Sequence, residues 1–174
     1  LSVGNDTGEA GCKNGTATIS LASDGTGSSG LGTTALASQT VNVTGGVYRY
    51  ASPTGHTPEP VSFGNVHVGD TASQLLSITN NVVNDGFSES LNASLGGATG
   101  GVTTNGGSFT QLAAAGTDNT SLSVGIDTST AGSKNGTATI TLASDGTGSS
   151  GLGTTALASQ TVNVTGGVYR YASP

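Results

Sequence analysis

Polar and apolar residues alternate along several short stretches of this 174-residue chain, and such a period of two predicts β-strands. The predicted strands cover residues 61–68, 74–79, 90–95, 108–112, 121–126, 137–142 and 159–165, and the last continues into 168–171. The side chains that the alternation turns inward are Val61, Phe63, Leu76, Ile78, Leu91, Ala93, Leu95, Leu122, Val124, Ile126, Ala138, Ile140 and Leu142. A Gly64-Asn65 break inside the first stretch predicts a bulge or a kink there.

The number and spacing of these strands indicate the fold class. About seven short strands in about 120 residues, separated by turn residues, predict an all-β fold of immunoglobulin-like antiparallel β-sandwich repeats. A β-barrel or a β-solenoid is the alternative. A solenoid repeats roughly every 20–30 residues, and the chain has no such short period.

A long internal repeat sets the domain organisation. Residues 1–53 align with residues 122–174 at an offset of 121, and 48 of the 53 positions are identical. The pairs that differ are Asn5/Ile126, Gly8/Ser129, Glu9/Thr130, Cys12/Ser133 and Ser20/Thr141. We therefore interpret residues 54–174 as one full 121-residue repeat and residues 1–53 as the C-terminal part of another, within a tandem array.

Two features concern the junction between these parts. Pro53, Pro58 and Pro60 lie close together, which predicts a semi-extended, proline-rich linker over residues 51–60. Residues 1–53 carry only about three strands, and half a sandwich exposes an apolar face and open edges. We therefore expect this part to be completed by another chain or segment, by strand complementation or domain swapping.

Composition narrows the function classes. The chain has only 4 Lys and Arg against 10 Asp and Glu, a net charge of −6, and 30 glycines. Four cations are too few for a nucleic-acid interface, and no apolar run approaches the roughly 18 residues of a membrane helix, so we expect neither nucleic-acid binding nor membrane insertion of this segment. A Gly/Ser/Thr-rich all-β chain of this kind is typical of extracellular material, and the single Cys12 has no cysteine partner in the chain.

No arrangement of residues predicts catalysis, so we expect neither an enzyme nor a required cofactor. Gly25-Thr-Gly-Ser-Ser-Gly30, repeated at 146–151, has the glycine spacing of dinucleotide sites, but another strand follows it in place of a helix, which favours a flexible loop. Asp24 and Asp145 are weak calcium candidates, because each loop offers one carboxylate, and Asp-Gly turns explain them better.

The histidines and tyrosines offer two further positions of interest. His56 and His67 lack partners at metal or triad spacing, which predicts surface roles for both. All four tyrosines occur in two Tyr-Arg-Tyr segments, one in each copy. The residues are Tyr48, Arg49 and Tyr50, and Tyr169, Arg170 and Tyr171. Each segment either closes the end of the sandwich core or forms a contact between successive repeats.

The stretch Pro60-Val-Ser-Phe-Gly-Asn-Val-His-Val-Gly69, followed by Ser77-Ile-Thr-Asn-Asn81, resembles the opening strands of the bacterial choice-of-anchor D family. The later stretches 85–93 and 137–146 are similar to that family as well. The resemblance implies immunoglobulin-like repeats, secreted or attached to the cell surface, within large bacterial extracellular proteins. It implies no catalytic residues.

These observations favour a structural role. The hypothesis is a structural repeat of a bacterial extracellular fibre, matrix component or surface stalk, which assembles with copies of itself by strand complementation or by end-to-end contacts between repeats. Its expected location is extracellular or on the cell surface. The alternative is an adhesin-like module that recognises glycans or a host surface through loops such as residues 96–107.

Overall fold

The structure of the protein, a computed structural model, describes residues 1–173, and Pro174 lies outside the described residues. The chain forms two compact units, residues 1–48 and the residues from Arg49 onward. Every regular element in the described part is a β-strand. No helix among residues 1–173 is long and apolar enough to cross a membrane.

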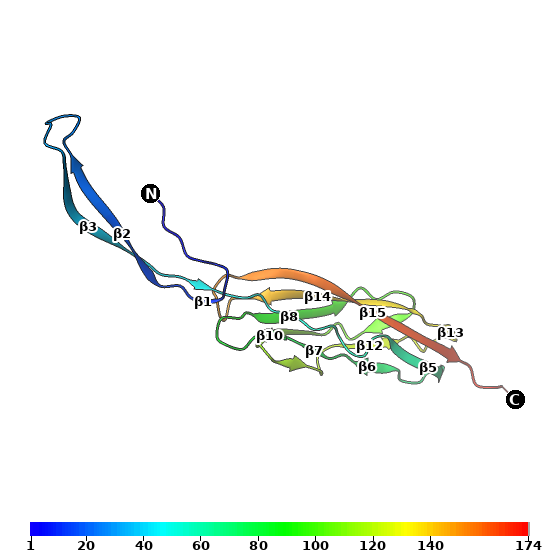
Figure 1. The fold of residues 1–174 in the computed structure, drawn as a ribbon. Coiled ribbons are helices and arrows are strands. Elements are labelled where there is room, and N and C mark those ends of the chain that lie inside the picture. The colour runs from blue at the N-terminus through cyan, green and yellow to red at the C-terminus, as the bar shows by residue number, and fades with distance from the viewer. Residues whose placement is uncertain (174) are drawn as a thin grey trace. The chain divides into compact units, whose positions relative to one another are not determined.

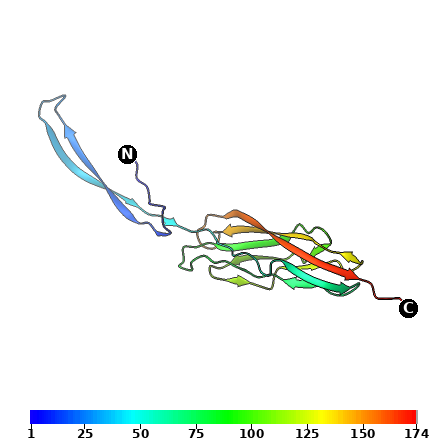
Figure 2. The same cartoon turned by 45° about the vertical axis from the view of Figure 1, so that its right-hand side comes forward.

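The larger sheet of the second unit has β8, β14 and β15 at its centre (Figure 1). Its strands are β5 (Val61–His67), β8 (Ser90–Gly96), β10 (Ser108–Leu112), β13 (Gly132–Ser133), β14 (Gly136–Asp145) and β15 (Thr154–Tyr169). They are ordered β10-β8-β14-β15-β13, and β5 pairs in parallel with β15, whereas the other pairs are antiparallel. Both views show β14 and β15 side by side along the unit (Figure 2).

A second layer of short strands faces this sheet. Its strands are β6 (Ser73–Leu75), β7 (Ile78–Thr79), β9 (Val102–Thr104), β11 (Thr117–Asp118) and β12 (Ser123–Ile126). They form a three-stranded sheet, β6-β12-β9, and a two-stranded sheet, β11-β7. The prediction of an all-β, immunoglobulin-like sandwich is confirmed, although Val102–Thr104, within the expected loop 96–107, forms strand β9.

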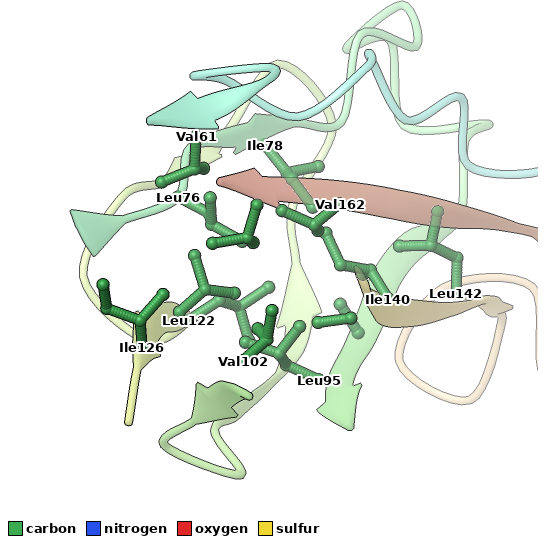
Figure 3. Close-up of a cluster of buried hydrophobic side chains, with 14 of the residues drawn as sticks. Val61, Leu76, Ile78, Leu95, Val102, Leu122, Ile126, Ile140, Leu142 and Val162 are labelled. Carbon is green, nitrogen blue, oxygen red and sulfur yellow. The ribbon is translucent and has the colours of Figure 1, made fainter. Parts of the chain in front are cut away.

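The core lies between the two layers and contains the side chains that the alternation turns inward, except Phe63, which is only partly buried (Figure 3). The core also contains side chains outside that predicted set, namely Ala51, Val102, Val162, Val164 and Val168. Leu76, Leu91, Leu122, Ile140 and Leu142 are each at most 1% exposed. Because one slip in register would turn every such side chain to solvent, the alternation fixes how the strands pair. Gly64 has a φ of 60°, and the β5–β15 register shifts beside it, as expected for the predicted kink.

The first unit is built on a hairpin whose strands β2 and β3 match β14 and the first part of β15 except at Ser20, where β14 has Thr141. Its strands are β1 (Gly11–Cys12), β2 (Gly15–Asp24), β3 (Thr33–Val43) and β4 (Gly46–Val47). The β2–β3 register runs from Gly15 opposite Val43 to Asp24 opposite Thr33, and it equals the β14–β15 register at the offset of 121. Both hairpins shift register at the same place, before Leu21 and Leu142. Local sequence therefore determines the hairpin, whatever surrounds it.

The proline-rich segment differs from the expected linker. Ala51 and His56 are only 5% and 7% exposed, and Pro53 forms a bridge with Asn80 of the second unit. His56 donates its backbone N–H to the Gln160 side chain at 2.9 Å. Ala51 and His56 thus anchor this segment along the sandwich, whereas residues 57–60 are exposed.

Truncation of the two equivalent isoleucines tests this description. Ile140 is fully buried, so Ile140→Ala is expected to lower the free energy of unfolding of the second unit by about 2–5 kcal/mol. Ile19 occupies the same position in the uncovered hairpin of the first unit. Ile19→Ala is therefore expected to change the measured free energy of unfolding by less than about 1 kcal/mol. Urea denaturation of the full chain, followed by circular dichroism, measures both. Equal losses would contradict the assignment.

Candidate functional site: the face of the N-terminal hairpin

In the second unit, the face of hairpin β14–β15 is covered by the residues that precede it. We call residues 49–121 the cover segment. The hairpin side chains beneath it are Ala138, Ile140, Leu142, Val162 and Val164, each at most 1% exposed. Burial of these groups supplies most of the hydrophobic stabilisation that holds cover segment and hairpin together.

A buried carboxyl group joins the two parts at one end of the face. Glu89, at 2% exposure, accepts hydrogen bonds from Ser144 Oγ at 2.7 Å and Ser150 Oγ at 2.6 Å. Ser144 Oγ in turn accepts the backbone N–H of Ala51 at 2.8 Å. Because a buried polar group without partners is costly, this cluster favours one placement of the cover segment over all shifted ones.

Asp145 extends the same cluster outward. Its Oδ1 accepts hydrogen bonds from the Thr147 backbone N–H and hydroxyl, and its Oδ2 accepts from Asn92 Nδ2 at 2.8 Å and Gln111 Nε2 at 3.4 Å. The hydrogen bond from the Thr147 hydroxyl, followed by those from the Thr147 backbone and Asn92, lowers the pKa of Asp145 to about 2. Both carboxylate oxygens are engaged in protein contacts, and no three His, Cys, Asp or Glu side chains within residues 1–173 form a metal-binding group.

A second polar cluster lies farther along β15. The ring nitrogens of His56 lie 3.0 Å from Gln160 Oε1 and 2.7 Å from Glu59 Oε2. Glu59 also accepts hydrogen bonds from the backbone and side chain of Asn163. Burial raises the pKa of Glu59, but the hydrogen bonds from Asn163 and His56 outweigh it and leave that pKa below its usual value. The predicted surface role of His56 is therefore wrong: its side chain is buried, and its ring nitrogens contact Gln160 and the partly exposed carboxylate of Glu59.

The hairpin of the first unit carries the same residues without a cover. Its polar groups Ser23, Asp24, Ser29, Gln39 and Asn42 match Ser144, Asp145, Ser150, Gln160 and Asn163, and all five are exposed. Within residues 1–48 no side chain takes the place of Glu89, and the pKa of Asp24 is lowered by hydrogen bonds from Thr26 alone.

The apolar part of this face borders a groove. The groove has a volume of about 540 Å³, and the apolar residues that line it are Leu1, Val3, Ala17, Ile19 and Val41. The counterparts of these residues, Leu122, Val124, Ala138, Ile140 and Val162, all lie in the core of the second unit. The groove is thus lined by the residues that, in the second unit, form part of the closed core.

The two glycine-rich loops connect hairpin strands. Gly25 donates its N–H to the Gly32 carbonyl at 2.9 Å, and Gly146 donates to Gly153 at 2.7 Å, so each loop closes on itself. A strand follows each loop, whereas a dinucleotide site needs a helix N-terminus there.

The Tyr-Arg-Tyr segments lie at both ends of the second unit. Arg49 Nη1 forms an ion pair with Asp85 Oδ2 at 2.7 Å, and the Arg49 N–H bonds to the Phe87 carbonyl. At the other end, the Tyr171 ring stacks on His67 with ring centroids 4.0 Å apart. More than half of the surface of each of Tyr50, Tyr169 and Tyr171 is exposed, so these three side chains do not cover the core, whereas Tyr48 is half-buried.

No protein-family model matches the sequence, and no curated protein matches it. Among solved structures, the chain is similar to an ASH/PapD-like domain of human CEP192, PapD-like domain 7. That similarity has a TM-score of 0.47 and 10% sequence identity, and it covers 71% of this chain and 89% of that domain.

Asp145 gives a testable dependence on pH. Because its folded pKa is about 2, against an ordinary 3.8, its stabilising contribution is complete above about pH 4 and is lost as the pH falls toward 2. Asp145→Asn is expected to destabilise the second unit at neutral pH and to flatten its loss of stability between pH 4 and 2. Urea midpoints measured across that range test this, with Asp24→Asn as the matched control. Glu59, Asp85 and Asp127 of the second unit also have lowered pKa values, so part of the acid dependence remains; a dependence as steep in Asp145→Asn as in the unsubstituted chain would contradict the prediction.

Proposed function

We propose that this chain is a structural segment of a tandem-repeat protein in which sandwich units follow one another directly. The observation that carries the proposal is the junction. Val47 still pairs with Gly11 of the first unit, and Arg49 already bridges to Ser88 of the second, so only Tyr48 separates the two paired positions. A protein built to span distance gains from such short connections, because long flexible linkers collapse as random coils.

The other end of the second unit repeats the junction sequence. Val168 and Tyr169 end β15 as Val47 and Tyr48 end the first unit. The residues that follow, Arg170 to Ser173, equal Arg49 to Ser52, which pack on the second unit. Residues 170–173 could therefore form the first segment of a further unit after β15, as residues 49–52 do for the second unit.

The proposed setting is a bacterial extracellular fibre, matrix component or surface stalk. Three features support it: the scarcity of charge, the Ser/Thr-rich outward strand faces, and the resemblance of residues 60–81 to choice-of-anchor D repeats. An adhesin-like role lacks comparable support, because residues 96–107 carry neither an aromatic nor a charged side chain.

Immunogold electron microscopy of the native source, with antibodies against this chain, tests the setting. We expect label along filaments, matrix or stalks outside the cell. Label confined to the cell interior, or to dispersed single molecules, would contradict the structural role.

Force spectroscopy tests the repeat architecture separately. A polypeptide of four consecutive copies of residues 49–169, which keeps each folded unit whole, is expected to unfold in equal steps, one for each folded unit. Each step adds a contour length of about 400 Å, less the folded length of the unit, because 121 residues extend by roughly 3.3–3.6 Å each. Steps of unequal size, or a single featureless extension, would contradict a chain of equivalent units.

A further inference from the structure

We infer that the exposed face of hairpin β2–β3 is a docking surface for a further copy of the cover segment, a polypeptide with the sequence pattern of residues 49–121, joined directly in front of Leu1. The inference rests on the tandem-repeat part of the proposed function and names the partner of one face. The occupant is identified by what covers the same sequence in the second unit.

The apolar complementarity is direct. Ala17, Ile19 and Leu21 of β2 occupy the positions at which Ala138, Ile140 and Leu142 are buried by the cover segment. The hairpin keeps the same strand register in both units, so these side chains have the same spacing along the face. A two-stranded hairpin is marginally stable in water by itself, which makes a second layer favourable.

The polar groups specify the same occupant. Ser23 and Ser29 are placed to donate to a carboxyl group as Ser144 and Ser150 donate to Glu89. Gln39 and Asn42 match the side chains that bind His56 and Glu59 of the cover segment. An unrelated apolar partner would bury these groups without hydrogen bonds, at a cost that a copy of the cover segment avoids.

Two interruptions in the first unit point to the same missing strands. Leu1 to Gly4 have the sequence of Leu122 to Gly125, yet residues 2–5 form no strand, whereas β12 is held by β6 and β9 of the cover segment. Thr44 and Gly45 lie outside any strand, whereas the equivalent part of β15 is continuous and pairs with β5. Both differences are explained by the absence of β5, β6 and β9.

The five substitutions between the copies leave this face almost unchanged. Four of them fall where the second unit has exposed residues, namely Ser129, Thr130, Ser133 and Thr141. The fifth puts Asn5 in place of Ile126, which is 4% exposed in the core. Docking therefore remains favourable overall, with one polar defect at the edge of the new core.

A second intact copy of the chain is a poor occupant. Each chain contains one cover segment and two hairpins that need it. If one copy gave its cover segment to the first hairpin of another copy, its own second hairpin would lose that cover, so the number of exposed hairpin faces would not fall. The occupant must therefore bring an additional cover segment, and in the second unit this segment is joined to Leu122 through Ser121.

The test adds residues 49–121 in front of Leu1 of the full chain and measures amide hydrogen exchange by mass spectrometry. Peptides from β2 and β14 differ by one methylene group, Ser20 against Thr141, so these two strands can be followed separately. We expect exchange in β2 to slow at least ~100-fold, to the level of β14.

Matched variants separate docking from mere lengthening of the chain. In the extended protein, Ile19→Asp is expected to abolish the protection of β2, because it puts a charge on the docking face. Thr40→Asp adds the same charge at the position of Thr161, which is exposed in the second unit, and is expected to leave the protection intact. Asn5→Ile is expected to increase the protection by removing the polar defect.

Three outcomes overturn the inference: β2 exchange that is unchanged by the extension, protection that survives Ile19→Asp, or a dimer of the unextended chain in which β2 is already protected. The last, detected by light scattering, would make a second copy the occupant. Equal force steps from the array of residues 49–169 would stand in all three cases, so failure here leaves the proposed repeat architecture intact.

Discussion

The structure depends on one constraint: a two-stranded sheet cannot bury its own apolar face. In the second unit the cover segment supplies all strands of the opposite layer except β12 and adds β5, β8 and β10 to the sheet of the hairpin, and the hairpin side chains Ile140 and Val162 become fully buried. In the first unit the same hairpin forms with the same register, and its face is open. Local sequence thus determines the hairpin, whereas the sandwich requires a layer from elsewhere in the chain.

Hydrophobic burial brings the two layers together but does not select where the cover segment sits along the hairpin. Selection comes from polar groups that lose water when the layers meet. Glu89 is satisfied only if the hydroxyls of Ser144 and Ser150 arrive at its two oxygens. A shifted cover segment would leave that carboxyl group buried without partners, which costs more than the apolar contacts of one residue contribute. Specificity in this low-charge chain therefore rests on few positions.

Much of the fold could be predicted because alternation by two reports burial directly. It identified Leu91, Ala93 and Leu95, and the same parity extends to Glu89, which lies two residues before Leu91. That parity was the available signal for a buried carboxyl group. The packing of His56 had no such signal, since its partner Gln160 lies 104 residues away and the proline-rich composition around it is typical of linkers. Contacts between irregular segments depend on tertiary proximity, which periodicity does not encode.

The folded unit and the sequence repeat are out of phase, and this has a physical consequence for assembly. Residues 49–53 end one copy in sequence, yet Arg49 and Ala51 are held by the unit that follows. Each unit of the proposed array thus takes its first segment from the end of the preceding copy. A division between Tyr48 and Arg49 leaves the following unit complete, whereas a division at the sequence repeat, after Pro53, removes Arg49 and Ala51 from the unit that holds them. Association in such an array should therefore be governed by ends at which a hairpin face is open, while its interior units are already complete.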